Sequence, residues 1–284
     1  MRRGIDIAVA VICLSLFWAA ESRVGAPPSR VTVRIAECAN SQASQLLLLK
    51  LADSFGKLDV GTVTWQTLKG DTAEDLENSS RADIVGVFDV VFTGDRDFAS
   101  KLERIGLLRA SFTVFMEELI LAGPVASVGQ FSGISTEEVM RRIFSEERTF
   151  FSLFKNKWIA DAEAELYRRS KITAPGANRR YVESSRGDIE ALIQAGDENA
   201  FILICEASFA QYQDSQRDSP VLAKISGTGI FKETRMCLIS DSGFRRERVA
   251  AADRYAEWLL SPDGGDAVES FEMGGINPFR SGSH

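Results

Sequence analysis

The sequence predicts an α/β fold of two lobes, with mostly parallel sheets flanked by helices. The chain has 284 residues and is 45% hydrophobic, which is enough for two modest domains with their own cores. After residue 28, short apolar runs alternate with stretches whose apolar residues recur every three or four positions. Apolar strands that alternate with helices are typical of parallel sheets covered on both faces.

The first 26 residues differ from the rest of the chain. Arg2 and Arg3 precede a largely apolar run from Ile5 to Ala20. A short basic start and an apolar stretch of this length are typical of a secretory signal peptide. We therefore expect residues 1–26 to be a signal peptide or an uncleaved N-terminal anchor, and the protein to be periplasmic. A buried core helix is the alternative.

The next part of the chain begins with a strand and a helix. Val31–Ala36 is apolar and β-branched, as expected of a strand, and Asn40 or Ser41 is placed to cap the helix that follows. The remaining elements predicted here are strands at 60–66 and 83–88, a short helix opening at Asp71, and a helix at 99–105.

The alternation continues to the end of the chain. Ser135 and Glu138 form a capping box ahead of a helix, and Pro262 is expected to end the last clear helix. Trp158 and Trp258 lie at helical spacing with apolar residues, so we expect them to pack in the core. Strands are predicted at 119–122, 149–154, 200–205 and 236–240, and helical stripes at Ile159/Ala162/Leu166, Ile189/Leu192/Ile193 and Ala252/Tyr255/Trp258/Leu259.

Catalytic chemistry is hard to assemble from these residues. The one histidine, His284, is the last residue, so the usual Ser-His-Asp and Cys-His arrangements are excluded. The Gly-rich nucleotide-binding and nucleophile-elbow motifs are absent. Cys38 is a remaining candidate nucleophile, with no histidine to activate it. Glu117 and Glu118 point to opposite faces of a strand, so we expect them to be solvated or hinge-region charges. We predict that the protein is not an enzyme and carries no cofactor.

Charge and cysteine content limit the partners further. A net charge of −7 argues against a nucleic-acid partner, which requires a basic surface, but does not exclude a small anion. Cys38, Cys205 and Cys237 match no metal-binding spacing. A fourth cysteine, Cys13, lies in the predicted signal segment. The three cysteines that follow it cannot all pair within one chain, so one disulfide or none is expected, and the pairing stays open.

Polar turns follow several predicted strands at the point where a helix begins. Free backbone N–H groups at such a turn, together with Asn, Ser and Gln side chains, suit an oxyanion or a carboxylate. Plain N-capping is the alternative at each position, and Arg186 is equally well explained as a solvated charge. Because the carboxyl ends of parallel strands meet at one edge, the repeated turns predict a pocket. The candidate ligand-binding residues are Asn40, Ser41, Gln42, Ser44, Lys69, Gly70, Ser152, Lys155, Ser184, Ser185, Arg186 and Glu206.

Three stretches resemble the type II periplasmic solute-binding proteins, in particular the tungstate- and molybdate-binding branch of ABC-transporter receptors. Residues 74–88, EDLENSSRADIVGVF, resemble that family's helix and following strand. Residues 117–124, EELILAGP, resemble its crossing strand, and residues 258–271, WLLSPDGGDAVESF, its C-terminal helix and turn.

The resemblance implies two lobes joined by crossing strands, with a ligand cleft between them that closes by a hinge motion. Lobe 1 would comprise residues 30–117 and 235–284, and lobe 2 residues 118–234. The implied partners are a small anionic solute and the membrane permease and ATPase of an ABC transporter, with the receptor a monomer. By the same resemblance, Asn40, Ser41 and Ser44 match the turn that binds the oxyanion, and Ser152 matches a donor loop in lobe 2.

The loop at 152–158 departs from the family pattern. It has the sequence SLFKNKW, where the family carries Arg and Gly, and Lys155 is the residue that would replace the positive charge. Two functions follow as hypotheses. One is an exported receptor for a tungstate- or molybdate-like oxyanion or another small anion. The other is a ligand-sensing or interaction module that partners a membrane receptor through Phe154 and Trp158.

Overall fold

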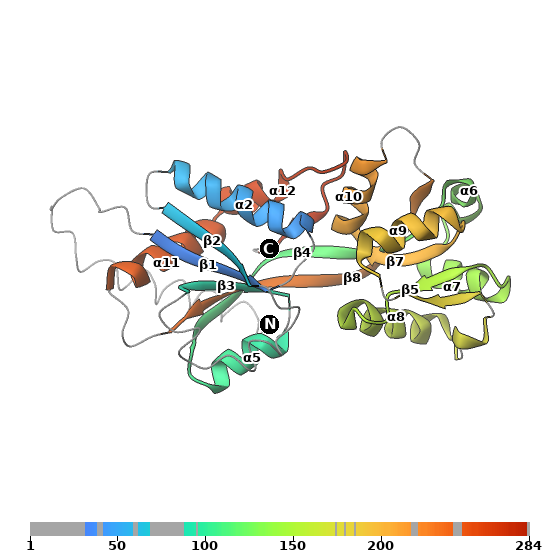
Figure 1. Cartoon of the computed structure of the whole chain (residues 1–284), viewed down its shortest axis with the longest axis horizontal. Coiled ribbons are helices and arrows are strands. Elements are labelled where there is room, and N and C mark those ends of the chain that lie inside the picture. The colour runs from blue at the N-terminus through green and yellow to red at the C-terminus, as the bar shows by residue number, and fades with distance from the viewer. Residues whose placement is uncertain are drawn as a thin grey trace.

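The computed structural model consists of two lobes joined by a pair of long strands (Figure 1). It describes residues 32–38, 42–58, 62–68, 88–94, 96–173, 175–178, 180–184, 186–216, 221–240 and 246–282. The predicted signal peptide at 1–26 and the predicted helix at Asp71 lie outside the described residues. No helix in the described ranges combines the length and the apolar character that crossing a membrane requires.

The described strands form one mixed sheet with the order β2-β1-β3-β8-β4-β7-β5-β6, and β9 pairs with β4. The pairs among β1, β2 and β3 are parallel, and so are those among β5, β6 and β7. Every pair that includes β4 or β8 is antiparallel. The strands are β1 Thr32–Cys38, β2 Thr62–Leu68, β3 Val90–Thr93, β4 Leu108–Pro124, β5 Phe150–Ser152, β6 Tyr181–Glu183, β7 Phe201–Cys205, β8 Leu222–Ile239 and β9 Phe279–Ser281.

Helices cover the sheet in both lobes, which confirms the predicted α/β class (Figure 1). The Ser135 cap is also confirmed, because its hydroxyl accepts a hydrogen bond from the Glu138 amide at the start of α7. The described helices are α2 Gln42–Lys57, α5 Arg96–Arg104, α6 Val128–Phe131, α7 Thr136–Ser145, α8 Lys157–Ser170, α9 Asp188–Asp197, α10 Glu206–Ser215, α11 Arg246–Leu259 and α12 Pro262–Glu269, with short 3-10 turns η1 Val125–Ser127 and η2 Pro175–Ala177.

Strand alternation divides the core of lobe 1 into two layers. Val90 and Phe92 of β3 pack with α2, α11 and α12 on one face. Val91, between them, packs with α5 on the other face. Successive side chains of a strand point to opposite faces, so one short apolar strand serves both layers.

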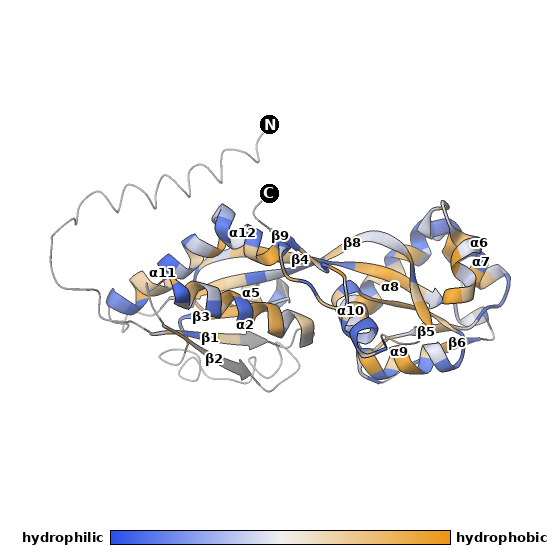
Figure 2. Ribbon diagram, turned by 90° about the horizontal axis from the view of Figure 1, so that it is seen from above, coloured by the Kyte–Doolittle hydropathy of each residue, from blue (hydrophilic) through white to orange (hydrophobic). Residues whose placement is uncertain are grey.

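Lobe 2 has a separate apolar core, whose buried members lie between Leu119 and Leu222 along the chain. Its strands are hydrophobic along most of their length, whereas the helices around them carry polar residues on their outer sides (Figure 2). The buried residues of the two lobe 1 layers extend up to Phe115 and continue from Met236, apart from Ala207. The lobe boundaries 30–117 with 235–284 and 118–234 remain our proposal.

The largest difference from the sequence prediction is the length of the two long strands. We predicted strands at 119–122 and 236–240, but β4 has 17 residues and β8 has 18. Their remaining stretches are half-buried and mix polar with apolar residues, and the β4–β8 register shifts at four places. Irregular pairing of this kind breaks the strict alternation on which strand prediction relies.

Other differences are local. Most of the strand predicted at 83–88 lies outside the described residues, and β3 begins at Val90. Ile189, Leu192 and Ile193 lie on a helix, as predicted, and the Ile193 side chain is 44% exposed. Trp158 and Trp258 are each partly buried against a core, as expected. Cys205 and Cys237 are buried free thiols, so these two cysteines do not form a disulfide.

Helix α11 ends at Leu259, and Pro262 then opens α12 rather than only ending the helix before it. Ser261 caps α12, because its hydroxyl accepts from the Gly264 amide at 3.4 Å and donates to the Trp258 carbonyl at 2.6 Å. A Cβ at Gly264 would overlap the Trp258 carbonyl oxygen and lie 2.7 Å from Leu259 Cα. Glycine is therefore required where the two helices meet.

We expect Gly264→Ala to destabilise the protein by about 2 kcal/mol or more, because the atoms it would overlap belong to rigid backbone. Urea unfolding followed by circular dichroism measures this loss. The matched control is Gly56→Ala in α2, where a Cβ would have no neighbour within 4 Å, and which should change stability by about 0.5 kcal/mol at most. Equal effects of the two substitutions would contradict the close approach at Gly264.

Candidate functional site

The register of the sheet determines where the strands of lobe 1 end. Strand β8 runs from Leu222 in lobe 2 to Ile239 in lobe 1. Strand β3 is antiparallel to it, with Val90 opposite Leu238 and Thr93 opposite Arg235, so its carboxyl end points toward lobe 2. Strands β1 and β2 run parallel to β3, and their carboxyl ends point the same way.

The strands of lobe 2 end in the opposite direction. Strand β7 is antiparallel to β4, with Ile202 opposite Ala122 and Cys205 opposite Leu119, so its carboxyl end points toward lobe 1. Strands β5 and β6 follow the same direction. Six carboxyl ends thus face one another across the middle of β4 and β8, at Cys38, Leu68, Thr93, Ser152, Glu183 and Cys205.

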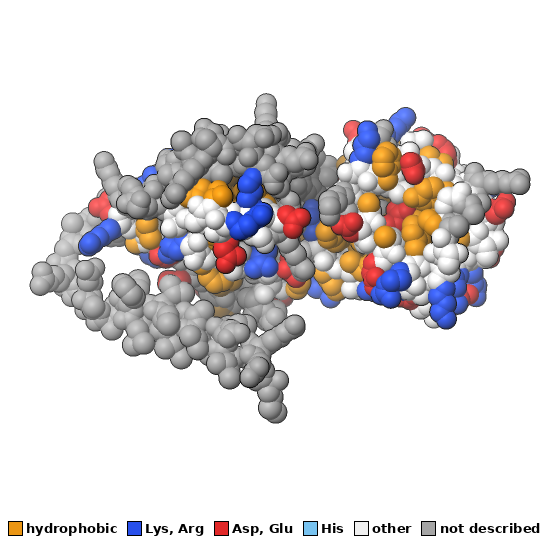
Figure 3. Space-filling view, turned by 90° about the horizontal axis from the view of Figure 1, so that it is seen from below, with side chains coloured by type: hydrophobic (Ala, Val, Ile, Leu, Met, Phe, Trp, Pro, Cys, Tyr) orange, Lys and Arg blue, Asp and Glu red, His pale blue; other side chains and the backbone are white. Residues whose placement is uncertain are grey.

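We call these facing ends, with the helix starts that follow them, the strand-end region. Ligands of open α/β sheets bind at the carboxyl ends of strands, where unpaired N–H groups of helix N-termini attract anions. Helices α2, α8, α9 and α10 begin directly after β1, β5, β6 and β7. Acidic and basic side chains are scattered over both lobes on the face that Figure 3 shows.

The predicted site residues fall into three groups. Asn40, Ser41, Lys69, Gly70 and Ser185 lie outside the described residues, as does the side chain of Gln42. Lys155 and Arg186 are exposed at the starts of α8 and α9. The buried residues are Ser44, Ser152, Ser184 and Glu206. None of these assignments is tested by a ligand, so they remain predictions.

Ser152 and Ser184 are brought together at neighbouring strand ends, where the Ser184 amide donates to the Ser152 carbonyl at 2.8 Å. The Ser152 hydroxyl donates to Glu163 Oε2 at 2.8 Å, so its proton is directed into lobe 2. The Ser184 hydroxyl accepts from the Arg186 amide at 3.3 Å. Both hydroxyls therefore take part in organising the loops, and neither caps a helix, because the N-caps of α8 and α9 are Asn156 and Gly187.

Glu163 of α8 is a buried carboxylate at the centre of this arrangement. It is 2% exposed and also accepts hydrogen bonds from the hydroxyls of Tyr167 and Tyr181. Burial raises the pKa of Glu163, although the hydroxyls of Tyr167, Ser152 and Tyr181 act in the opposite direction. The network joins α8 to β5 and β6 and holds the loop at 152–158.

Glu206, the first residue of α10, is already paired. Its Oε1 lies 2.5 Å from Lys224 Nζ, and an acid is favourable in the first turn of a helix. Glu118 lies on the same side, 4.0 Å from Lys224 Nζ and 3.7 Å from Arg280 Nη2, and accepts from the Gly229 amide at 3.0 Å. Glu118 is therefore held by contacts between strands and is not a solvated charge.

Glu117 forms a second charged cluster that the sequence analysis missed. Its side chain is fully buried, and Oε1 lies 3.8 Å from Lys232 Nζ on the opposing strand. The ammonium also lies 5.9 Å from the centre of the Trp158 ring. The pairing of Glu117 with Lys232 was hard to predict from the sequence, because Lys232 falls in the part of β8 that was not predicted as a strand.

Burial and the charge of the partner shift the pKa of Glu117 in opposite directions, and the same holds for Lys232. Burial raises the pKa of Glu117, and the charge of Asp188 adds to this, while Lys232 lowers it. For Lys232, burial lowers the pKa, but the acidic groups beside it, Glu117 foremost, outweigh burial and raise it. Lys232 is therefore a cation at neutral pH.

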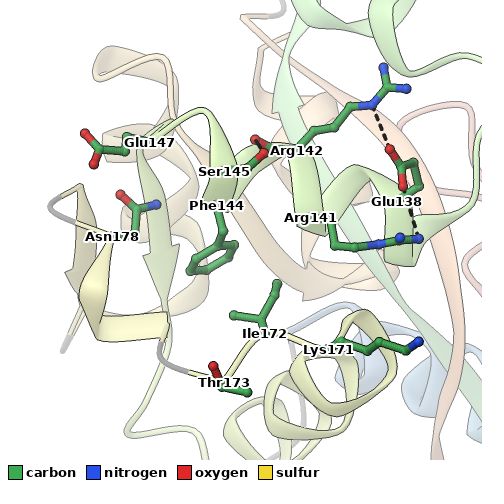
Figure 4. A pocket seen from close by; sticks show the side chains of 10 residues that line it. All are labelled: Glu138, Arg141, Arg142, Phe144, Ser145, Glu147, Lys171, Ile172, Thr173 and Asn178. Carbon is green, nitrogen blue, oxygen red and sulfur yellow. Dashed lines mark hydrogen bonds and ion pairs between the residues drawn. The ribbon is translucent and has the colours of Figure 1, made fainter.

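Lobe 2 also carries a cavity of about 630 Å³ between α7 and the segment that follows α8 (Figure 4). Its two arginines, Arg141 and Arg142, both pair with Glu138 at 3.0 Å. The single carboxylate of Glu138 offsets one of the two positive charges. Helix α7, which lines this cavity, lies on the side of lobe 2 that is farther from lobe 1 (Figure 1). Within the described residues, no group of three or more His, Cys, Asp or Glu side chains is placed to hold a metal ion.

The fold of this chain is similar to the folds of several solved binding proteins. Among solved structures, the tungstate-binding protein TupA from Desulfovibrio alaskensis G20 aligns with a TM-score of 0.74 at 18% identity, over 89% of this chain and all of that one. A tungstate ABC transporter protein from Geobacter sulfurreducens aligns with a TM-score of 0.65 at 18% identity, over 84% and 98% of the chains.

The periplasmic molybdate-binding protein of Azotobacter vinelandii is more distant, with a TM-score of 0.52 at 15% identity over 83% and 95% of the chains. No protein-family model matches the sequence, and the comparison with curated proteins gives no match. At these identities the comparisons establish the fold, which confirms the predicted two-lobed architecture.

The Glu163 network predicts a pH dependence of stability. Because the pKa of Glu163 is raised on folding, the folded state binds this proton more tightly, and stability falls as pH rises through the raised pKa. We expect Glu163→Gln to reduce this fall, which for one group reaches at most about 1.4 kcal/mol per pH unit. Urea unfolding at several pH values above the ordinary carboxyl range measures the slope.

The control is Glu165→Gln on the same helix. Arg168 and Arg169 lower the pKa of Glu165 to about 2, so this exposed group stays ionised in both states over that range and the slope should not change. An unchanged slope in Glu163→Gln would show that Glu163 keeps an ordinary pKa.

Proposed function

We propose that the protein is an exported solute receptor of an ABC-type uptake system that binds a small anion between its lobes. The observation that carries this proposal is the register that directs six strand ends toward one another across β4 and β8. The starts of α2, α8 and α9 supply N–H groups there, and Lys232 supplies a buried positive charge.

The known proteins with this fold support a particular class of solute. Two of them are described as tungstate proteins and one as a molybdate-binding protein. We therefore propose a tungstate- or molybdate-like oxyanion as the first candidate and another small anionic solute as the second. A periplasmic location, a permease and ATPase as partners, a monomeric receptor and a binding role without catalysis belong to the same proposal.

The site residues remain part of the proposal too. Asn40, Ser41, Gln42 and Ser44 would bind the solute from lobe 1, and Lys69 and Gly70 are further proposed contacts. Lys155 and Arg186, exposed at the starts of α8 and α9, would bind it from lobe 2. The remaining predicted contacts are Ser152, Ser184, Ser185 and Glu206, of which Ser152 and Glu206 already engage Glu163 and Lys224.

One observation favours a second function, a ligand-sensing or interaction module. Phe154, in the loop between β5 and α8, is 41% exposed, and an exposed ring at that position would suit contact with a membrane receptor. Trp158 does not add to this surface, because it packs partly buried against the lobe 2 core. Affinity purification that recovers a receptor kinase instead of a permease would favour this function.

The direct test of the proposed function is thermal unfolding against tungstate, molybdate, sulfate, phosphate and small carboxylates. A solute at about a hundred times its dissociation constant adds about 2.7 kcal/mol to the free energy of unfolding, which raises the midpoint clearly. We expect one anion, or a related pair, to produce this shift.

The control variant is Arg141→Ala/Arg142→Ala, which alters the lobe 2 cavity and leaves the strand-end region intact. It should keep the full shift. No shift with any anion would contradict the anion-receptor function, and loss of the shift in the control would move the site to the lobe 2 cavity.

A further inference from the structure

The Glu117–Lys232 pair lies at the base of the strand-end region. The two residues are direct partners in the β4–β8 register, and Leu119, on the same face as Glu117, is opposite Cys205 at the end of β7. Lys232 Nζ is near the ring of Trp158, the second residue of α8. The first turn of α8 and the end of β7 therefore meet the crossing strands at this pair.

The carboxylate of Glu117 lacks hydrogen-bond partners. Both carboxylate oxygens of Glu117 are buried and accept no hydrogen bond. The 3.8 Å between Oε1 and Nζ exceeds the length of an N–H···O hydrogen bond. Burying two charges costs free energy unless hydrogen bonds complete the pair. The pair is therefore weak evidence for a stabilising contact.

Of the two side chains in the pair, only that of Lys232 is partly exposed to solvent. Its side chain is 14% exposed, whereas that of Glu117 is not exposed at all. Trp158 contacts the ammonium through its ring, which provides no hydrogen-bond acceptor lone pair. An anionic oxygen that reached the exposed part of Lys232 would make a charge-assisted hydrogen bond in surroundings with little water, where such bonds are strong.

We propose that Lys232 is the cation that binds the anionic solute at the base of the strand-end region, and that Glu117 is its proton-linked counter-charge. This inference rests on the proposed function and adds to it the residue that provides charge recognition. It places that recognition on a crossing strand, outside the polar turns that the sequence analysis selected.

A consequence of this arrangement is that anion affinity depends on pH. Protonation of Glu117 removes one negative charge beside Lys232, so the anion binds more tightly as the pH falls through the pKa of Glu117. Burial raises that pKa above the usual carboxyl range.

The other titratable groups near the pair are Asp188 at the start of α9 and Cys205 at the end of β7. The Asp188 carboxylate accepts from the Ser208 hydroxyl at 2.8 Å. Burial raises the pKa of the Cys205 thiol well above its usual value, so that group stays neutral. Glu117 is thus the group whose protonation changes the charge of the cluster.

The test is isothermal titration of the purified protein with sodium tungstate, sulfate and phosphate at a series of pH values from the usual carboxyl range upward. Glu117→Gln mimics the protonated carboxyl, so we expect it to bind the anion more tightly than the wild type at the upper end of the series, and to bind tungstate and sulfate with a weaker pH dependence than the wild type shows. Glu117→Gln/Lys232→Met removes both charges together, which avoids leaving one buried charge unpaired. It should lose about tenfold to a hundredfold in affinity, as expected for one charge-assisted hydrogen bond.

Circular dichroism and thermal midpoints of both variants establish that they are folded. Wild-type affinity in the double variant, or an unchanged pH dependence in Glu117→Gln, would overturn this inference and leave the anion-receptor function standing. No binding of any of the three anions by the wild type, in titration or in thermal unfolding, would overturn both.

Discussion

The antiparallel pairing of β4 and β8 is the constraint on which the rest of the structure depends. The two strands run through both lobes in opposite directions. Each lobe adds its parallel strands to an edge of this pair, β3 to β8 and β7 to β4, both in antiparallel fashion. The two antiparallel additions orient the strand ends of the lobes toward each other. A single rule of sheet geometry thus makes the strand ends of the two lobes face each other.

The sequence predicted the fold where its pattern is local and strong. The buried run Phe201–Cys205 and the Ser135 cap of α7 appear almost where they were expected. It did not predict the full length of β4 and β8, because residues such as Arg109, Thr113 and Lys232 interrupt the apolar pattern. Those strands are defined by pairing across more than a hundred positions of sequence, and a local pattern holds no information on such pairing.

The candidate site was predictable in its location but not in its chemistry. Turns at strand ends identified Ser152, Ser184 and Glu206, and the structure does bring Ser152 and Ser184 together. In the structure the Ser152 hydroxyl donates a hydrogen bond to Glu163, and Glu206 forms an ion pair with Lys224. No spacing in the sequence reveals these pairings. Glu117 was treated as a background hinge charge because its partner, Lys232, lies 115 positions later and becomes a neighbour only through the β4–β8 register.

The most direct test of the account is a crystal structure of the protein grown with the anion that stabilises it most. The account predicts electron density for that anion between the lobes, with an oxygen within hydrogen-bond distance of Lys232 Nζ and contacts to the first turn of α8. Density in the cavity beside Arg141 and Arg142, with none between the facing strand ends, would contradict it.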